Sequence, residues 1–273
     1  MASPAVAPIR TEATVVENCA EGGVNRRLVL RIEGWPGFGP GQFLMLSPGA
    51  LADVRRTDPL LPRPMAVYRA RRRNGAADVE ILFKVSGRGT GLLAESLPGQ
   101  RIGVLGPLGR SFDLPAPGER AILVAGGTGI ASVYELAGNA SAGAEVAVLL
   151  GARTADDLMG VADFEKLAVD LRIATEDGSA GRRGLVTLLL EEALAEAGAA
   201  RVYACGPTAM MRRCAEIATE RGRPCSVSLE NNMACGFGVC LGCAAPLREG
   251  GFALVCRDGP MFESAEVDWE GLP

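Results

Sequence analysis

The stretch Glu230-Asn-Asn-Met-Ala-Cys-Gly-Phe-Gly-Val-Cys-Leu-Gly-Cys243 places three cysteines in one tight loop. Cys235, Cys240 and Cys243 have the spacing C-x4-C-x2-C, and Cys256 follows after twelve further residues. This is the ligand spacing of plant-type [2Fe–2S] clusters, in which a distant fourth cysteine completes the set. The glycines between the cysteines let the backbone approach closely and turn N–H groups toward the sulfurs. The stretch therefore predicts a [2Fe–2S] cluster on these four cysteines.

A structural zinc site is the alternative for four cysteines. Such sites more often show two C-x2-C pairs, whereas this loop has one x4 gap and one x2 gap, so the spacing favours the cluster. The sequence contains no histidine, which removes imidazole bases, His-ligated zinc and Rieske-type centres. Any chemistry must come from cofactors, cysteines, carboxylates or hydroxyls.

Upstream of the cysteines, compact apolar runs alternate with helical segments. The runs are 121–125, 145–150, 171–175, 201–205 and 226–229, and the clearest helical segments are 130–137, 186–197 and 208–220. Strands that alternate with helices predict a parallel sheet wound by crossovers.

A glycine-rich turn lies between the first of these strands and the helical segment 130–137. The turn Gly126-Gly-Thr-Gly129 would let backbone N–H groups and a helix N-terminus face a pyrophosphate. Ser132 stands at the third position of G-x-G-x-x-G, so the fingerprint is imperfect and a plain tight turn is the alternative.

The first 116 residues are rich in short strand-like runs. Examples are 14–16, 28–32 and 43–46, and Asn74-Gly75 between 65–68 and 79–84 is a strong hairpin signal. These features predict a small antiparallel barrel. A proline-rich break at 114–119 suggests a domain boundary. The expected fold class is α/β plus β-barrel, with a barrel over 1–116, an α/β domain over 117–229 and a small cysteine-rich lobe over 230–273.

Two further stretches of the barrel could contact a phosphate. Ser86–Leu92 is a glycine-rich loop after a strand, for which a ligand-free flexible loop is an equal alternative. Arg63 precedes Pro64 at the start of a strand and could clamp a phosphate, although alone it would be a solvated loop end. We expect Arg71–Arg73 to be a solvated hairpin tip.

Composition limits the partners. The chain has 273 residues and a net charge of −4, with no basic footprint for nucleic acid. No apolar run is long enough to span a membrane, and Met1–Pro8 lacks the features of a secretion signal. Together with eight cysteines best interpreted as ligands, redox groups or small buried residues, this predicts a cytoplasmic protein.

Taken together, the motifs resemble the electron-transfer subunits of the NAD-linked (class 1B) dihydroorotate dehydrogenases, within the ferredoxin-reductase-like superfamily. The most specific part of the resemblance is 230–243, continued by 255–262. The other stretches that carry it are Asp58–Pro64, Gly87–Thr90, Leu105–Gly109, Gly126–Gly129, Thr175–Ser179 and Tyr203–Pro207. The resemblance implies FAD on the barrel, NAD on the α/β domain and a [2Fe–2S] cluster that faces a partner.

The resemblance also implies the cofactor contacts. Those for FAD are Arg63, Pro64, Met65, Ala66, Gly87, Gly89 and Thr90. Those on the nicotinamide side are Gly126, Gly127, Thr128, Gly129, Cys205, Gly206 and Pro207. Cys205 would be the catalytic residue, a small polarisable side chain that permits close ring stacking; the alternative is a core residue at a strand end.

The sequence departs from the family pattern at two positions. Ala66 stands where the family usually has Ser or Thr, so only its backbone is available to contact the flavin ring. Ser132 stands where family members often have proline. Neither change removes a phosphate contact.

The resemblance further implies a division of labour. A flavin can exchange hydride with nicotinamide and single electrons with a cluster, so it belongs between them. Dihydroorotate would be oxidised by FMN on a separate catalytic subunit, in a heterotetramer of two of each. Electrons would then reach NAD+ through the cluster and FAD, as a step of pyrimidine biosynthesis. No residue of this chain looks like a dihydroorotate site.

Two other functions share these motifs. One is a subunit of another flavin and iron–sulfur complex, such as a ferredoxin:NADP or sulfur-reducing oxidoreductase. The other is a zinc-stabilised regulatory module that senses dinucleotide. The choice between NADH and NADPH also stays open, because Arg153 would suit a 2′-phosphate whereas Asp156 and Asp157 would oppose it.

Overall fold

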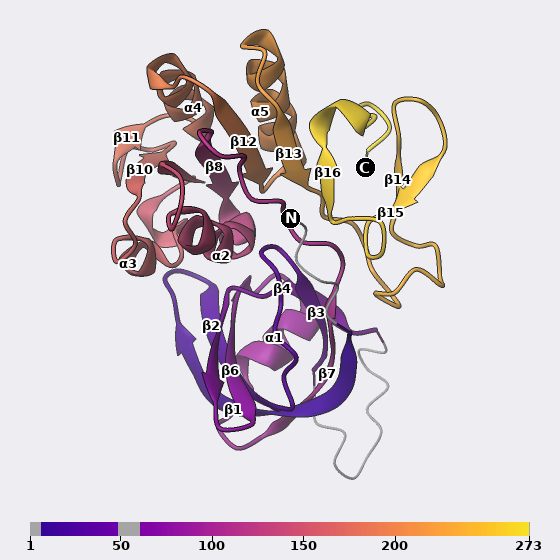
Figure 1. The fold of residues 1–273 in the computed structure, drawn as a ribbon. Helices are drawn as coiled ribbons and strands as arrows, with labels where there is room; N and C mark the ends of the chain where they lie inside the picture. The colour runs from indigo at the N-terminus through magenta and orange to yellow at the C-terminus, as the bar shows by residue number, and fades with distance from the viewer. Residues whose placement is uncertain (1–6, 49–60, 273) are drawn as a thin grey trace.

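Seven antiparallel strands form the first part of the chain and curl into a half-barrel (Figure 1). The computed structural model describes residues 7–48 and 61–272. The strands run in the order β4-β3-β7-β1-β2-β6-β5. Their bounds are β1 Ile9–Ala20, β2 Asn25–Glu33, β3 Phe43–Ser47, β4 Arg63–Ala66, β5 Arg69–Arg73, β6 Ala76–Lys84 and β7 Arg101–Leu108. Inward-facing apolar residues such as Leu28, Leu30 and Ile81 are fully buried, which gives the half-barrel its own core.

The structure corrects the strand that enters the predicted hairpin. The turn at Asn74-Gly75 is present, but β5 leads into it, with Arg73 opposite Ala76. Residues 63–66 instead form β4, which pairs with β3. The run Arg71–Arg73 is exposed, as expected, but it forms part of β5 rather than the tip of the hairpin. A polar strand on the edge of a sheet gives no apolar alternation to detect from sequence.

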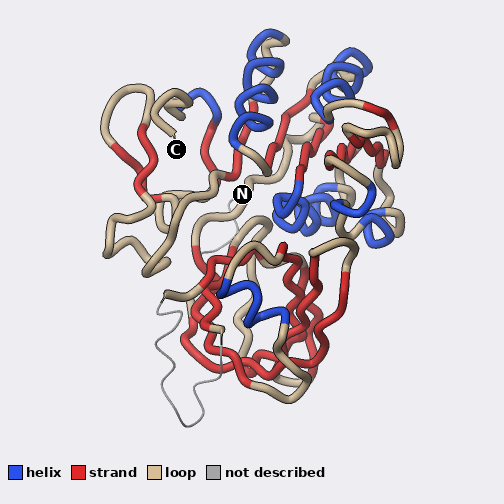
Figure 2. Tube along the Cα trace, turned by 180° about the vertical axis from the view of Figure 1, so that it is seen from behind, coloured by secondary structure: helices blue, strands red, loops and turns tan. Residues whose placement is uncertain are grey.

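A short helix interrupts the half-barrel. Residues predicted as a glycine loop form α1, Arg88–Ala94, which lies across the strands (Figure 2). Leu93 is buried in the core of the half-barrel and anchors the helix there.

The second part is a parallel sheet, as predicted, and helices cover both of its faces. The sheet order is β11-β10-β9-β8-β12-β13-β16. The elements are β8 Arg120–Gly126, α2 Ile130–Ala140, β9 Val146–Ala152, α3 Val161–Phe164, β10 Asp170–Thr175, β11 Arg182–Arg183, α4 Val186–Glu196, β12 Ala200–Cys205, α5 Thr208–Glu220 and β13 Cys225–Ser228. Helices α4 and α5 pack on one face, and α2 packs on the other.

The last part is a loop-rich lobe beside both other parts (Figure 1). It contains the hairpin of β14 Ala244–Pro246 and β15 Phe252–Leu254. β16, Met261–Glu263, then pairs antiparallel with β13 and so extends the central sheet. The lobe is therefore tied to the α/β domain through main-chain hydrogen bonds. None of the helices in the described ranges is long and apolar enough to cross a bilayer.

Candidate functional site

The first candidate cavity, of about 360 Å³, lies where all three parts of the chain meet. The barrel contributes β4 and the end of β6, the sheet contributes the turn after β8, and the lobe contributes its first residues. Among the residues that line the cavity are Pro64, Met65, Ala66, Thr90, Thr128, Ser132, Ser228 and Glu230. A cavity at the carboxyl ends of parallel strands is where open α/β sheets bind their ligands.

The predicted FAD residues of the barrel come together at one edge of this cavity. Pro64, Met65, Ala66 and Thr90 line it. Arg63 lies directly against Gly89, where a Cβ atom would collide with the guanidinium group. The Thr90 hydroxyl accepts hydrogen bonds from the N–H groups of Ser86 and Gly87, which closes the first turn of α1. Arg63 and the start of α1 therefore form one surface. Asp58–Leu60, also part of the resemblance, lie outside the described residues.

The two turns predicted on the nicotinamide side also meet. Gly129 packs against the Cys205 carbonyl so closely that a side chain would collide with it. Gly206 has φ of +152° and packs against the backbone of Gly126. Only glycine allows these approaches, and they bring the start of α2 against the end of β12.

Cys205 ends β12 and is fully buried. Burial and the nearby Glu230 carboxylate raise the pKa of its thiol to about 12, although the Ser132 and Ser228 hydroxyls act in the opposite direction. Both serines line the first cavity. The thiol thus lies neutral behind the cavity wall, so its contribution would be size and polarisability rather than nucleophilic attack.

Glu230 was quoted in the sequence motif but given no role, and the structure places it in the first cavity. Burial raises the pKa of this carboxyl group. It lies two residues after Ser228, the last residue of β13, at the edge of the sheet where functional side chains gather, and this signal could have identified it.

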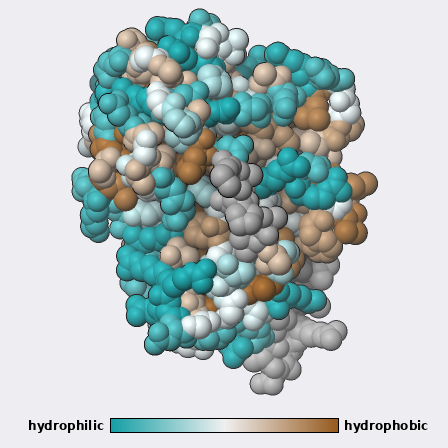
Figure 3. Space-filling view, in the orientation of Figure 1, coloured by the Kyte–Doolittle hydropathy of each residue, from teal (hydrophilic) through white to brown (hydrophobic). Residues whose placement is uncertain are grey.

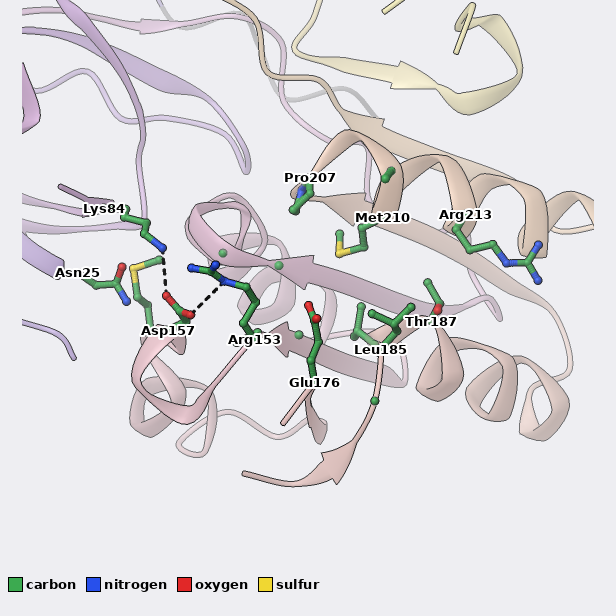
Figure 4. Close-up of a pocket in the computed structure, with 18 residues that line it drawn as sticks. Asn25, Lys84, Arg153, Asp157, Glu176, Leu185, Thr187, Pro207, Met210 and Arg213 are labelled. Atoms are coloured by element: carbon green, nitrogen blue, oxygen red, sulfur yellow. Dashed lines mark hydrogen bonds and ion pairs between the residues drawn. The ribbon is translucent and has the colours of Figure 1, made fainter. Parts of the chain in front are cut away.

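A second cavity, of about 480 Å³, opens on the sheet side of the same turns (Figure 4). Gly126, Gly127 and Pro207 line one side of it. Arg153, Asp157 and Glu176, which follow β9 and β10 in the chain, line another side. The cavity therefore runs from the glycine turn across the carboxyl ends of three adjacent strands. That path suits an extended dinucleotide with its pyrophosphate at the start of α2.

The four cysteines of the lobe are arranged as two pairs. Cys243 and Cys256 are buried, with their sulfur atoms 3.2 Å apart, and Cys240 contacts Cys235. Over residues 7–48 and 61–272, no group of three or more His, Cys, Asp or Glu side chains is gathered around one point as a single metal ion requires. An arrangement in two pairs suits two thiolates on each of two irons.

The backbone of the cysteine loop is arranged to stabilise negative charge on sulfur. Burial raises the pKa of Cys235, but N–H groups of Cys240, Phe237 and Val239 directed at its sulfur outweigh this and lower the pKa to about 6. Gly236 and Gly238, with φ of +82° and +86°, shape this loop. Such N–H donors stabilise an anionic cluster.

The cluster loop continues directly from the first cavity. Asn231 and Met233 line that cavity, and Cys235 follows two residues later. Two residues of extended chain span at most about 7 Å. The first cavity and the cysteine loop are therefore neighbours.

The fold and these sites define an NAD-linked flavin and iron–sulfur electron-transfer protein of the ferredoxin-reductase type. Residues 230–268 match the model of the iron–sulfur cluster binding domain of dihydroorotate dehydrogenase B, and residues 123–216 match that of an oxidoreductase NAD-binding domain. The chain belongs to the family of electron transfer subunits of dihydroorotate dehydrogenase B (NAD+).

Individual relatives support this family over most of their length. The electron transfer subunit from Desulforamulus reducens is 37% identical over 85% of this chain and 87% of its own. The probable subunit from Methanopyrus kandleri is 39% identical over 96% of this chain and 93% of its own. Among solved structures, an NADH-dependent reduced ferredoxin-NADP oxidoreductase has a TM-score of 0.82 at 28% identity, over 99% of this chain and 92% of its own.

Proposed function

We propose that this chain accepts electrons from the FMN of a separate catalytic subunit that oxidises dihydroorotate, and delivers them to NAD+ in pyrimidine biosynthesis. The observation that carries the proposal is the continuity of the chain from Glu230 in the first cavity to the cysteine loop. FAD would occupy the first cavity, against Arg63–Ala66 and Gly87–Thr90. When bound, it exchanges hydride with nicotinamide and single electrons with a cluster.

The residues of the chain would hold and orient these groups. The N–H groups of the turn Gly126–Gly129 would take the dinucleotide phosphates, and Cys205 would leave room for ring stacking beside Gly206 and Pro207. Cys235, Cys240, Cys243 and Cys256 would hold the cluster. We assign these roles to a barrel over 1–116, an α/β domain over 117–229 and a lobe over 230–273, in a cytoplasmic protein.

The catalytic subunit would dock over the cysteine loop. Phe237, Val239 and Leu241 are 53%, 71% and 64% exposed around the exposed Cys240. Figure 3 shows hydrophobic surface on the outer edge of the lobe, while the barrel below is mainly hydrophilic. Exposed apolar side chains in one loop mark an interface. We propose a heterotetramer of two chains of each kind.

Reconstitution with the FMN-containing catalytic subunit tests the proposal. The isolated chain should pass electrons from NADH to ferricyanide but leave dihydroorotate untouched, and the complex should form NADH from dihydroorotate and NAD+. Val239→Asp should weaken assembly while keeping NADH:ferricyanide activity, and light scattering gives the stoichiometry. Dihydroorotate oxidation by the isolated chain, or a colourless zinc protein, would contradict the proposal.

The similarity to the NADH-dependent reduced ferredoxin-NADP oxidoreductase supports a second candidate, a reductase subunit that exchanges electrons with ferredoxin. Reduction of ferredoxin by NADH, without assembly on the dihydroorotate-oxidising subunit, would favour it.

A further inference from the structure

Most of the charged side chains that line the second cavity already have an oppositely charged partner (Figure 4). Three basic side chains line it, and each has a carboxylate partner. Lys84 and Arg153 share Asp157, at 3.0 and 3.5 Å. Arg213 lies within 3.5 Å of the carboxylates of Glu191, Glu216 and Glu220.

Glu176 is the exception among the charged residues that line this cavity. No ion pair or hydrogen bond to its carboxylate is present within residues 7–48 and 61–272. Its backbone is fixed, because its N–H donates to the Ala152 carbonyl at 3.1 Å. Figure 4 shows the Glu176 side chain pointing into the cavity beside Arg153, whose guanidinium group turns away toward Asp157. Asp177, the next residue, is instead occupied by Ser179.

The position of Glu176 along the sheet matches the adenosine half of a dinucleotide. The phosphates belong at the glycine turn after β8, and Gly126 pairs with Gly151 of β9. Thr175 of β10 in turn pairs with Ala152, so Glu176 and Arg153 follow paired residues on adjacent strands. A ligand that starts at Gly126 and crosses β9 would bring its ribose to Glu176 and Arg153.

We infer that Glu176 selects NAD over NADP, with Asp157 as a positioning residue that keeps Arg153 and Lys84 from binding a phosphate. A ribose 2′-hydroxyl donates a hydrogen bond to the Glu176 carboxylate. A 2′-phosphate would instead place two negative charges beside that carboxylate, with the nearby cations already paired. On this inference, Asp157 keeps Arg153 from serving a 2′-phosphate, and NADH is the preferred dinucleotide. The inference rests on the proposed use of NAD.

The test combines equilibrium binding with turnover in the holoprotein. Calorimetry would compare 5′-AMP with adenosine 2′,5′-bisphosphate, and ferricyanide reduction would give kcat/KM for NADH and NADPH. Variants are Glu176→Gln, Asp157→Asn and the double variant. The matched control is Glu145→Gln, an exposed glutamate just before β9, at the opposite end of that strand.

The wild type should prefer NADH over NADPH by about 100-fold or more in kcat/KM. Glu176→Gln should reduce this preference about tenfold and improve binding of the bisphosphate, because the like-charge contact is gone. The double variant should reduce the preference about tenfold further, since it also frees Arg153 and Lys84. Glu145→Gln should keep the wild-type ratio.

Two failures have different meanings. A ratio within twofold of the wild type in Glu176→Gln, at an unchanged melting temperature, would overturn the role of Glu176 while NADH use stands. A wild type that is reduced by neither dinucleotide would instead overturn the proposed function, and with it the inference.

Discussion

The half-barrel contacts the α/β domain through charged side chains and the cluster lobe through apolar packing. Its contact with the α/β domain is a buried network of ion pairs. Arg27 donates to Glu80 at 2.7 Å and to Asp163 at 2.8 Å, and Arg69 joins the same two carboxylates at 2.7 and 2.9 Å. Glu21 of the barrel adds a bond from the Gly160 N–H at 3.0 Å. Asp163 is the shared carboxylate from the α/β side, on α3.

The contact with the cluster lobe consists of close apolar packing around glycines. Gly236 lies against Met45, where a Cβ atom would be 2.5 Å from the nearest side-chain carbon. Gly109 packs in the same way against Pro260 and Phe43. These surfaces belong to one hydrophobic cluster that joins the barrel, the sheet and the lobe.

Each kind of contact suits the transfer step that it would support. Hydride transfer requires reacting atoms about 3–3.5 Å apart and aligned. A network of directional ion pairs is fully satisfied in only one orientation of the two domains, which is how buried polar groups can specify geometry. An electron leaving a cluster needs closeness rather than alignment, and apolar packing supplies closeness.

Of the variants that test this comparison, removal of the shared Asp163 carboxylate should cost the most stability. Asp163→Ala leaves Arg27 and Arg69 buried without that partner and should lower the free energy of unfolding by about 3–5 kcal/mol. Urea unfolding at neutral pH measures it. The matched control is Glu216→Ala, which removes a carboxylate from exposed pairs with Arg212 and Arg213 and should cost at most about 1 kcal/mol. Equal costs for the two variants would mean that the buried network does not hold the domains.

The lobe contact is tested by Gly236→Ala in the cluster-loaded protein. Gly236 has φ of +82°, which costs alanine about 1–2 kcal/mol, and the collision with Met45 adds about 1–3 kcal/mol. The variant should lose visible cluster absorption at lower urea concentration than the wild type. Gly250→Ala is the matched control, because Gly250 has φ of +93° but open space where the Cβ atom would lie. If both variants behave alike, the close packing contributes nothing beyond backbone strain.

Local patterns predicted the elements of this molecule well. Helix α5 was expected at its observed bounds, and the strand, glycine turn and helix around Gly126–Gly129 follow from residues that are adjacent in sequence. The cysteine loop was equally visible from spacing alone. In each case the residues that form the pattern lie close together in the sequence.

The contacts between parts could not be predicted in this way. Arg27 and Asp163 are 136 positions apart and belong to different domains, so no periodicity links them. The direction of the Arg153 guanidinium group depends on Asp157 and on Lys84 from the barrel. These contacts depend on the tertiary structure, which brings together residues that are far apart in the sequence.

Acid should destabilise the ion-pair network between the half-barrel and the α/β domain. Burial raises the pKa of Asp163, but hydrogen bonds from Arg27 and Arg69 outweigh this and lower it to about 2 from an ordinary value of 3.8. A carboxyl group with a lowered pKa stabilises the fold above its unfolded pKa and loses that contribution as pH falls toward the folded value. The stability difference between wild type and Asp163→Asn should therefore shrink by roughly 1–2 kcal/mol between pH 5 and pH 2.5. Urea titrations of both proteins measure this difference, and a constant difference across the range would contradict it.

Tyr68→Phe should have the smallest effect, and it separates the ion pairs from the ring packing around them. The Tyr68 hydroxyl donates to Asp163 at 3.2 Å, while the ring lies 4.4 Å from that of Tyr134 and beneath both arginines. Removal of the hydroxyl leaves the carboxylate with both arginines, so we expect a loss of only about 0.5–1.5 kcal/mol in urea unfolding. The same substitution in the Asp163→Asn background should cost less, because the charged acceptor is gone. The hydroxyl also packs closely against Gly160, where a Cβ atom would lie 2.6 Å from it. An undiminished cost in that background would assign the effect of Tyr68 to this packing, and the orientation of the domains would then depend on shape as well as charge.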